Sequence, residues 1–276
     1  MRQKRIVTVQ DLSCFGKCSL GVALPVISAC GIEAVALPTA ILSTHTGEFK
    51  NYTFCDLTDE MPKILKHWES LDIEFDAIYV GYLGSIHQLE LVERFIDHFA
   101  KSDTVVFVDP VMADNGELYA GFDKAFVKEM KKLIKRADVI CPNITEACFL
   151  TDSEYKKDGF DKAYIDEILD KLSKLSKNVI LTSVSYGETD FGAVALCDGV
   201  KKEEFHEKIE GQFYGAGDLF ASAFIGEYVK TKSFFESVKI STDFVRESIL
   251  NTLDEKERIW YGLKFEECLK LLYKEK

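Results

Sequence analysis

The chain has 276 residues, of which 47% are hydrophobic and 29% charged, an ordinary balance for a globular protein of one large or two small domains. Its net charge of −12 argues against nucleic-acid binding, because nucleic-acid phosphates need basic surfaces. No apolar run reaches the roughly 18 residues of a membrane-spanning helix. We therefore expect neither a nucleic-acid nor a membrane partner, although the charge does not exclude a small nucleotide.

Apolar strand-like runs alternate with amphipathic helical runs along the chain. Strands are expected at residues 5–10, 33–38, 76–80, 104–108, 138–141 and 178–182, followed by runs at 191–197 and 204–209 that can pair antiparallel at one edge. Helices are expected at residues 19–30, from 56, at 87–100, 122–136 and 161–176, and from 215, before a last pair of helices. Repeated strand–helix–strand units predict a mostly parallel sheet covered on both faces. No internal repeat or low-complexity linker appears, so residues 1–276 are expected to form a single domain.

Some stretches interrupt this alternation. Residues 11–17 contain glycine and are expected to form a loop, and residues 40–49 break the strand pattern because they are rich in hydroxyl groups. Asp56 is expected to cap the next helix, with Asp59 near the place of a capping-box partner. The stretch 113–121 is expected to be a loop and is our candidate for a lid over a bound substrate.

The eight cysteines are scattered and include no C-x-x-C pair. Cys14 and Cys18 are separated by three residues, without a second pair of that spacing or a nearby histidine, so zinc is not expected. Free thiols in apolar surroundings are typical of a reducing compartment. This pattern favours a cytoplasmic protein.

Polar side chains just past the ends of predicted strands indicate a binding site. These residues are Tyr82, Asp109, Asn143, Glu146 and Thr182. In open parallel sheets, ligands bind at the carboxyl ends of the strands. Simpler interpretations remain open: Asn143 and Glu146 can form a helix-capping pair, and His45 can be a loop histidine bonded to the backbone.

The stretch Gly215-Ala216-Gly217-Asp218 stands before an apolar run rich in small residues. It reads as a tight turn that opens a helix, where free N–H groups and the helix dipole favour an anion such as phosphate. Asp218 would lie beside that anion and could act as a base. The alternative is that Asp218 only caps the helix.

Together these motifs resemble the ribokinase-like (PfkB-type) kinases and, within them, the pyridoxal kinases, from about residue 5 to about residue 250. The segments that carry the resemblance are Gly81-Tyr82-Leu83-Gly84-Ser85, Asp109-Pro110-Val111-Met112, Pro142-Asn143-x-x-Glu146, residues 215–222 and Ser43-Thr44-His45-Thr46-Gly47. The Gly-x-Gly-Asp signature indicates only the superfamily. The segments at 81–85 and 43–47 are the more specific signal for the vitamin B6 branch.

The resemblance implies a three-layer α/β/α fold and ATP-dependent phosphorylation of the 5′-hydroxymethyl group of pyridoxal, pyridoxine or pyridoxamine. Asp218 would be the catalytic base. The backbone N–H groups of Gly215, Ala216 and Gly217 would form the anion hole for the transferred phosphoryl group. Such a reaction depends mainly on positioning and charge neutralisation.

The resemblance also implies roles for the other polar residues. Asp109 and Glu146 would act around Mg²⁺ and the ATP phosphates, with Asn143 and Thr182 along the phosphate path. The residues expected at the substrate ring are Asp11, Phe15, His45, Thr46 and Tyr82. A monovalent cation beside Mg²⁺ and a homodimer are further expectations that the sequence alone does not test.

Three positions depart from the family pattern. Ala216 replaces a threonine, Asp11 stands where many pyridoxal kinases carry a serine that contacts the ring, and Thr44 replaces an asparagine. Because of the carboxylate of Asp11, the identity of the substrate stays open. The alternatives are a hydroxymethylpyrimidine kinase of thiamin synthesis, a sugar kinase, for which the signal is weaker, and a catalytically weak vitamer-binding protein on the same fold.

Overall fold

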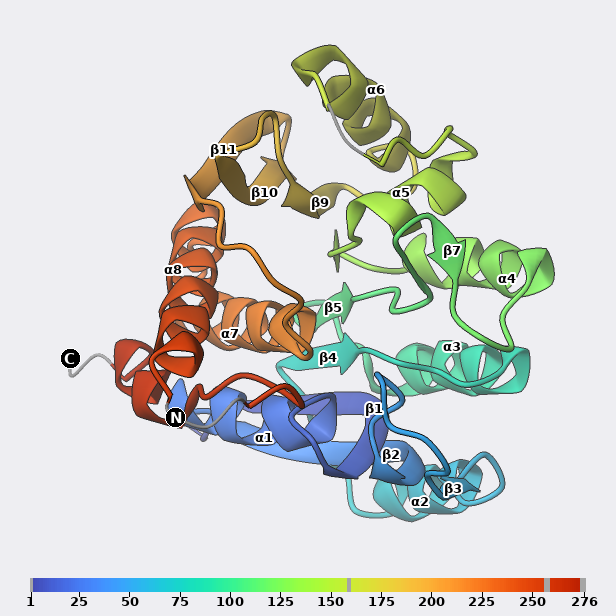
Figure 1. The fold of residues 1–276 in the computed structure, drawn as a ribbon. Coiled ribbons are helices and arrows are strands. Elements are labelled where there is room, and N and C mark those ends of the chain that lie inside the picture. Colours follow the sequence, from blue (N-terminus) through green and yellow to red (C-terminus); the bar gives the residue numbers. More distant parts are fainter. Residues whose placement is uncertain (1, 158–159, 256–258, 274–276) are drawn as a thin grey trace.

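The computed structural model describes residues 2–157, 160–255 and 259–273. Within the described residues, the centre of the molecule is a nine-stranded sheet. Its strand order is β11-β10-β9-β8-β5-β4-β1-β2-β3 (Figure 1). The strands are β1 Arg5–Phe15, β2 Glu33–Thr44, β3 Phe54–Asp56, β4 Ala77–Val80, β5 Val105–Val108, β8 Val139–Ile140, β9 Asn178–Val184, β10 Asp190–Cys197 and β11 Val200–Glu207. The inner strands pair in parallel, and the two edges are antiparallel. The predicted mostly parallel sheet and its antiparallel edge pair are therefore confirmed.

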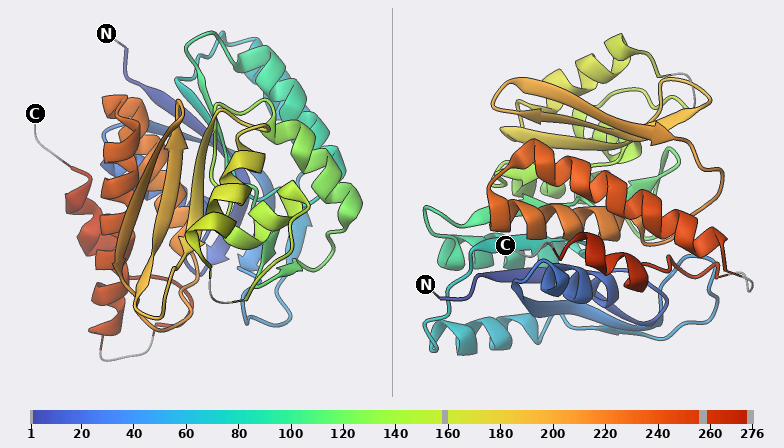
Figure 2. Two further views of the ribbon diagram at one scale, coloured as in Figure 1. Left: turned by 90° about the horizontal axis from the view of Figure 1, so that it is seen from above. Right: turned by 90° about the vertical axis from the view of Figure 1, so that its left-hand side faces the viewer.

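Helices cover both faces of this sheet, which confirms the predicted three-layer α/β/α architecture. They are α1 Leu20–Ala29, α2 Met61–Glu69, α3 Ile86–Phe99, α4 Lys124–Ile134, α5 Ile144–Thr151, α6 Lys162–Leu172, α7 Ala216–Thr231 and α8 Phe234–Leu253, with the 3-10 helix η1 Glu266–Leu271 near the end. α1, α7 and α8 lie on one face and α2 to α6 on the other, as Figures 1 and 2 show. Among the described residues, none of these helices is long and apolar enough to cross a membrane.

The central strands are buried because their side chains are apolar on both faces. Val7 and Val9 of β1 belong to the core beneath α2 to α6, whereas Ile6 belongs to the core beneath α1 and α7. In β4, Ile78 and Tyr79 divide between these two cores in the same way. This period-two division is the geometry of a strand, and it explains why the runs are almost continuously hydrophobic.

Two strands extend further than the sequence pattern predicts. Residues 11–15 and 40–44 continue β1 and β2, with Ser13 opposite Leu42 and Phe15 opposite Thr44. The register shifts between Gln10 and Leu12, which marks a local irregularity. Backbone pairing with a long neighbour thus overrides the polar composition of these segments.

Two further local predictions are wrong. Asp56 ends β3 and accepts a hydrogen bond from the Thr58 N–H (2.7 Å), so it forms a turn, and α2 begins only at Met61. The stretch 113–121 contains a two-stranded hairpin, β6 Ala113–Asp114 and β7 Glu117–Leu118. The Gly116 N–H between these strands donates to the Thr145 hydroxyl (3.1 Å), which fastens the hairpin to α5. All eight cysteines are free thiols.

Candidate active site

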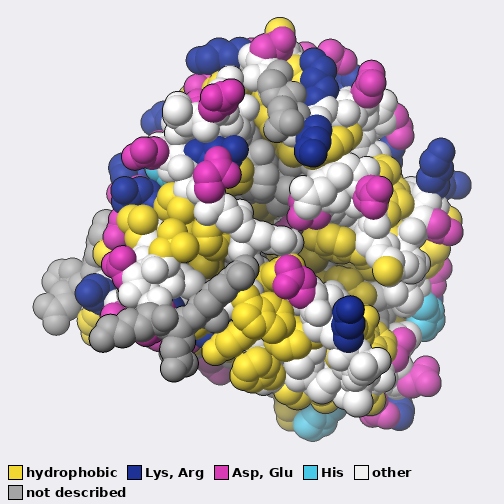
Figure 3. Space-filling model, in the orientation of Figure 1, with side chains coloured by type: hydrophobic (Ala, Val, Ile, Leu, Met, Phe, Trp, Pro, Cys, Tyr) yellow, Lys and Arg dark blue, Asp and Glu magenta, His cyan; other side chains and the backbone are white. Residues whose placement is uncertain are grey.

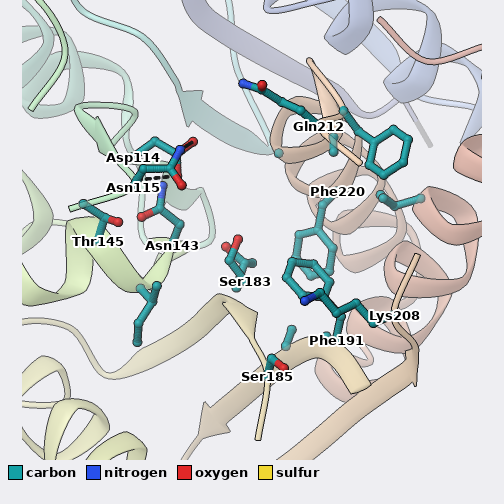
Figure 4. Close-up of a pocket in the computed structure, with 18 of the residues that line it drawn as sticks. Asp114, Asn115, Asn143, Thr145, Ser183, Ser185, Phe191, Lys208, Gln212 and Phe220 are labelled. Carbon is teal, nitrogen blue, oxygen red and sulfur yellow. Dashed lines mark hydrogen bonds between the residues drawn. The ribbon is translucent and has the colours of Figure 1, made fainter. Parts of the chain in front are cut away.

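A cavity of about 1420 Å³ opens where β5, β8 and β9 end and α7 begins. It brings together these predicted residues: Asp109, Asn143, Glu146, Thr182, Gly215, Ala216, Gly217 and Asp218. Figure 3 shows a hollow on this face of the molecule. In Figure 4, Asn143 and Thr145 stand on one wall and Phe191 and Phe220 on the opposite wall. The strand-end rule therefore predicted correctly that these residues meet at one edge of the sheet, while their roles stay predictions.

The turn before α7 depends on Gly215. Its φ is +79°, and a Cβ there would lie 2.0 Å from the Lys17 carbonyl oxygen. No side chain can occupy that space without moving the backbone of the segment that leads into α1. The turn is thus held tightly against residues 17–19.

The backbone N–H groups that follow Gly215 differ in their partners. The Ala216 N–H donates to the Phe213 carbonyl (3.3 Å), and the first helical bond runs from the Leu219 N–H to the Gly215 carbonyl (2.9 Å). The N–H groups of Gly217 and Asp218 lie between them, in the first turn, where a helix supplies no acceptor. A Cβ on Gly217 would meet no protein atom within 4 Å, so this position faces open space.

Asp218 lies in the first turn of α7 at the cavity wall. Its Oδ2 accepts a hydrogen bond from the Ser19 N–H (3.0 Å). Burial raises the pKa of Asp218 to about 7, with the Ser19 bond opposing this rise and the charge of Asp11 adding to it. A carboxylate with this pKa can take up a proton at neutral pH.

Glu146 is buried, and both of its oxygens accept backbone hydrogen bonds. Oε1 accepts from the Met112 N–H (2.9 Å) and Oε2 from the Asn143 N–H (2.9 Å). The Asn143 side chain in turn accepts from the Glu146 N–H (2.9 Å), so the two residues form a capping box at α5. The capping interpretation is therefore confirmed, while a role toward ATP stays a prediction.

Asp109 is buried beside Glu146, and a backbone hydrogen bond at Val111 offsets only part of the cost of this burial. Burial, together with the nearby charges of Glu146 and Asp218, raises the pKa of Asp109 well above its usual range. Within the described ranges, no group of three His, Cys, Asp or Glu side chains is arranged to hold a metal ion. A cation that shares its coordination with phosphate oxygens would still fit here, because it would relieve the repulsion at Asp109.

The residues expected at the substrate ring lie outside the lining of this cavity. They are Asp11, Phe15, His45, Thr46 and Tyr82. Asp11 is buried and accepts from the Ser19 hydroxyl (2.5 Å) and the Ser13 hydroxyl (3.0 Å). Since Ser19 also contacts Asp218, the two groups of predicted residues meet at Ser19.

His45 is held by the backbone at both ring nitrogens. Nδ1 accepts from the Gly47 N–H (3.1 Å), which requires the proton to be on Nε2, and Nε2–H donates to the Tyr261 carbonyl (3.0 Å). Burial lowers the pKa of His45. The structure thus confirms the loop-histidine interpretation.

Aromatic residues that the sequence analysis did not select surround His45. The ring centroid of His45 is 5.2 Å from that of Tyr214 and 4.8 Å from that of Phe49. The ring centroids of Phe49 and Trp260 are 4.6 Å apart. Tyr261 packs at 4.8 Å from Phe15, a residue that is 52% exposed. The sequence signals for this contribution were the adjacent aromatic pair at 260–261 and the places of Phe49 and Tyr214 beside stretches already selected.

Two other expected residues occupy less enclosed positions. Thr46 is exposed, and Tyr82 is partly buried, with its ring 5.8 Å from that of Phe122. Burial is the largest cause that raises the pKa of Tyr82 to about 12. The phenol therefore stays protonated at neutral pH and can donate a hydrogen bond.

The sequence pattern of the phosphomethylpyrimidine kinase family matches residues 23–260. The chain belongs to this family. Within its relatives, the pyridoxal kinase of Dictyostelium discoideum is 24% identical over 98% of this chain and 96% of its own length. The hydroxymethylpyrimidine/phosphomethylpyrimidine kinase of Bacillus subtilis is 29% identical over 66% of each chain.

Similar solved structures extend this result. A Bacteroides thetaiotaomicron protein provisionally assigned as a phosphomethylpyrimidine kinase, crystallised with pyridoxal, is 37% identical, with a TM-score of 0.92 over 98% of this chain and 96% of that one. Pyridoxal kinase from Lactobacillus plantarum is 28% identical, with a TM-score of 0.90 over 98% and 97%. The predicted resemblance to ribokinase-like and pyridoxal kinases is confirmed.

Proposed function

We propose that this kinase transfers the γ-phosphoryl group of ATP to the 5′-hydroxymethyl group of a vitamin B6 vitamer. The observation that carries the proposal is Asp218, a carboxylate with a pKa of about 7 at the start of α7. It lies beside the N–H groups of Gly217 and Asp218, which have no acceptor among the described residues. An acid tuned in this way beside an anion site is what proton removal coupled to phosphoryl transfer requires. The pyridoxal bound to the Bacteroides relative supports the choice of acceptor.

The reaction follows from these positions. An oxygen of the Asp218 carboxylate takes the proton of the acceptor hydroxyl, and the hydroxyl oxygen forms a bond to the γ-phosphorus. The bond from the γ-phosphorus to the bridging oxygen breaks, and ADP leaves with the electron pair. The N–H groups of Gly217 and Asp218 stabilise the charge on the transferred group, while Asn143 and Thr182 line the path of the ATP phosphates.

Asp109 is the side chain best suited to hold Mg²⁺, because the oxygens of Glu146 already accept backbone bonds. When bound, Mg²⁺ neutralises phosphate charge. We assign Glu146 a supporting role: it fixes the chain around Met112 and Asn143. A cytoplasmic location, a homodimer and a monovalent cation stay predictions of the sequence.

Hydroxymethylpyrimidine is the second candidate acceptor, and Asp11 is the observation that favours it. An ionised carboxylate only accepts hydrogen bonds, which suits the amino group of a pyrimidine. Burial, however, raises the pKa of Asp11, and a protonated carboxyl can donate to a pyridine nitrogen. Asp11 therefore suits both acceptors, and an assay with each acceptor alone distinguishes them.

The test is an ADP-release assay with ATP, Mg²⁺ and one acceptor at a time: pyridoxal, pyridoxine, pyridoxamine or hydroxymethylpyrimidine. We expect turnover with at least one B6 vitamer and a higher kcat/KM for it than for the pyrimidine. Turnover with the pyrimidine alone would replace the proposal by the second candidate. ATP-independent binding of vitamers without turnover would identify a binding protein.

A further inference from the structure

Ser19 has an unusual backbone conformation for a residue with a side chain. It precedes α1 with φ 51° and ψ −131°, in the half of conformational space that favours glycine. A serine at this position normally turns its hydroxyl back to cap the helix. Here it makes no such cap bond. Ser19 thus departs from two local preferences at once, which points to a function.

The hydroxyl and the N–H group of Ser19 bind two acids instead. Its hydroxyl donates to Asp11 Oδ1 (2.5 Å), and its N–H donates to Asp218 Oδ2 (3.0 Å). Ser19 is buried, so bulk water does not compete for these two hydrogen bonds. One residue therefore connects the acid expected at the substrate ring with the expected base.

We propose that Ser19 is a positioning residue that couples Asp11 to Asp218. The inference rests on the proposed function and deepens it, because it identifies a residue that orients the base toward the acceptor. The hydroxyl bond to Asp11 holds the strained backbone, and that backbone directs its N–H at Asp218.

The surrounding packing supports this coupling. The Lys17 carbonyl lies so close to Gly215 that a Cβ there would approach it to 2.0 Å. The segment before α1 and the turn before α7 are therefore in tight contact, and a change at Ser19 is transmitted to the start of α7. The carbonyl of Ser19 accepts from the Ala23 N–H (2.9 Å), so α1 itself anchors the other side of the residue.

Ser19→Gly is the informative variant. Glycine tolerates this φ and retains the N–H, but it lacks the hydroxyl and is free to adopt other conformations. Ser13→Ala is the matched control, because Ser13 also donates to Asp11 (3.0 Å) but, among the contacts of the described residues, not to Asp218. We expect Ser19→Gly to lower kcat about tenfold, the scale of a hydrogen bond to a charged group, with KM for ATP unchanged. Ser13→Ala should keep kcat near that of the wild type.

A double-mutant cycle with Asp11→Ala, which removes the acceptor of the Ser19 hydroxyl, distinguishes positioning from a general structural effect. If Ser19 acts through Asp11, Ser19→Gly should lower kcat much less in the Asp11→Ala background than in the wild type. Equal effects in both backgrounds, or wild-type kcat in Ser19→Gly, would overturn the inference.

The same cycle measured by urea unfolding needs no substrate. It should show coupling between Ser19 and Asp11, and additive effects on unfolding would overturn the inference even if the acceptor differs from a B6 vitamer. A wild-type protein without turnover on any acceptor would instead contradict the proposed function. The two failures are therefore distinguishable.

Discussion

Glu146 Oε1 accepts a hydrogen bond from the Met112 N–H at 2.9 Å, and this bond ties α5 to the segment that follows Asp109. The second carboxylate oxygen accepts from the Asn143 N–H. Burial raises the pKa of both acids, but their surroundings differ. The backbone bonds at both oxygens of Glu146 limit the rise of its pKa to about 7, whereas the neighbouring charges of Glu146 and Asp218 add to the rise at Asp109.

This difference predicts opposite effects of two similar substitutions. Glu146→Gln places an amide NH₂ opposite a backbone N–H, so the free energy of unfolding should fall by about 1–3 kcal/mol. Asp109→Asn removes charge repulsion and should leave that free energy equal or higher, while turnover falls because a cation ligand is lost. Urea unfolding and ADP release measure the two quantities. A stable Glu146→Gln protein beside a destabilised Asp109→Asn protein would refute the assignment.

The two glycines of the α7 turn should respond differently to alanine. Gly215→Ala forces a Cβ against the Lys17 carbonyl at positive φ, and we expect a loss of about 1–3 kcal/mol in unfolding free energy together with most activity. Gly217→Ala meets no protein atom and should fold normally, but its methyl group would occupy space beside the free N–H groups and raise KM for ATP. Thermal melts and ATP titrations check both variants; equal stability of the two would contradict the geometry.

Asp11 is predicted to contact the acceptor ring and to determine which acceptor is preferred. Asp11→Ser should change the ratio of kcat/KM between pyridoxal, pyridoxamine and hydroxymethylpyrimidine, because a hydroxyl both donates and accepts hydrogen bonds. KM for ATP should not change, since Asp11 lies outside the lining of the cavity at the strand ends. An unchanged preference ratio would remove Asp11 from ring recognition.

The pKa of Asp218 predicts a pH-dependent contribution to stability. Folding raises this pKa from an ordinary 3.8 to about 7, so the folded state binds the proton more tightly than the unfolded state. The group therefore destabilises the charged folded protein above about pH 7, and this penalty disappears as the pH falls through 7 toward 4. Relative to the wild type, Asp218→Asn should be more stable at pH 8 and should lose most of that advantage at pH 5. Urea unfolding at both pH values checks this, and a pH-independent difference would contradict the raised pKa.

The sequence predicted the parts of the fold that depend on local pattern. The apolar alternation around Val7 and Ile78 marked the central strands, and parallel pairing then placed Asp109 and Asn143 at one edge. The extension of β1 through Asp11 to Phe15 could not be predicted, because it depends on pairing with β2 and not on the residues themselves.

The predicted site was incomplete for a similar physical reason. The contact between His45 and the Tyr261 carbonyl joins residues that are 216 positions apart. The bond from Ser19 to Asp218 joins residues 199 positions apart. Neither contact leaves a local pattern, and the φ of Ser19 contradicts the usual preference of its residue type. Asp218 itself was predictable because a glycine turn before a helix has a local signature.

The most direct test of the account is ADP release with pyridoxal, ATP and Mg²⁺ at pH 8 by the wild type and by Asp218→Asn. Asp243→Asn serves as a control, because Asp243 is an exposed acid on α8 that pairs with Lys239. We predict that Asp218→Asn lowers kcat by about 10²-fold or more, the scale of a general base, while the Asp243 variant keeps wild-type turnover. Turnover by Asp218→Asn close to that of the wild type would contradict the role of Asp218 as the base.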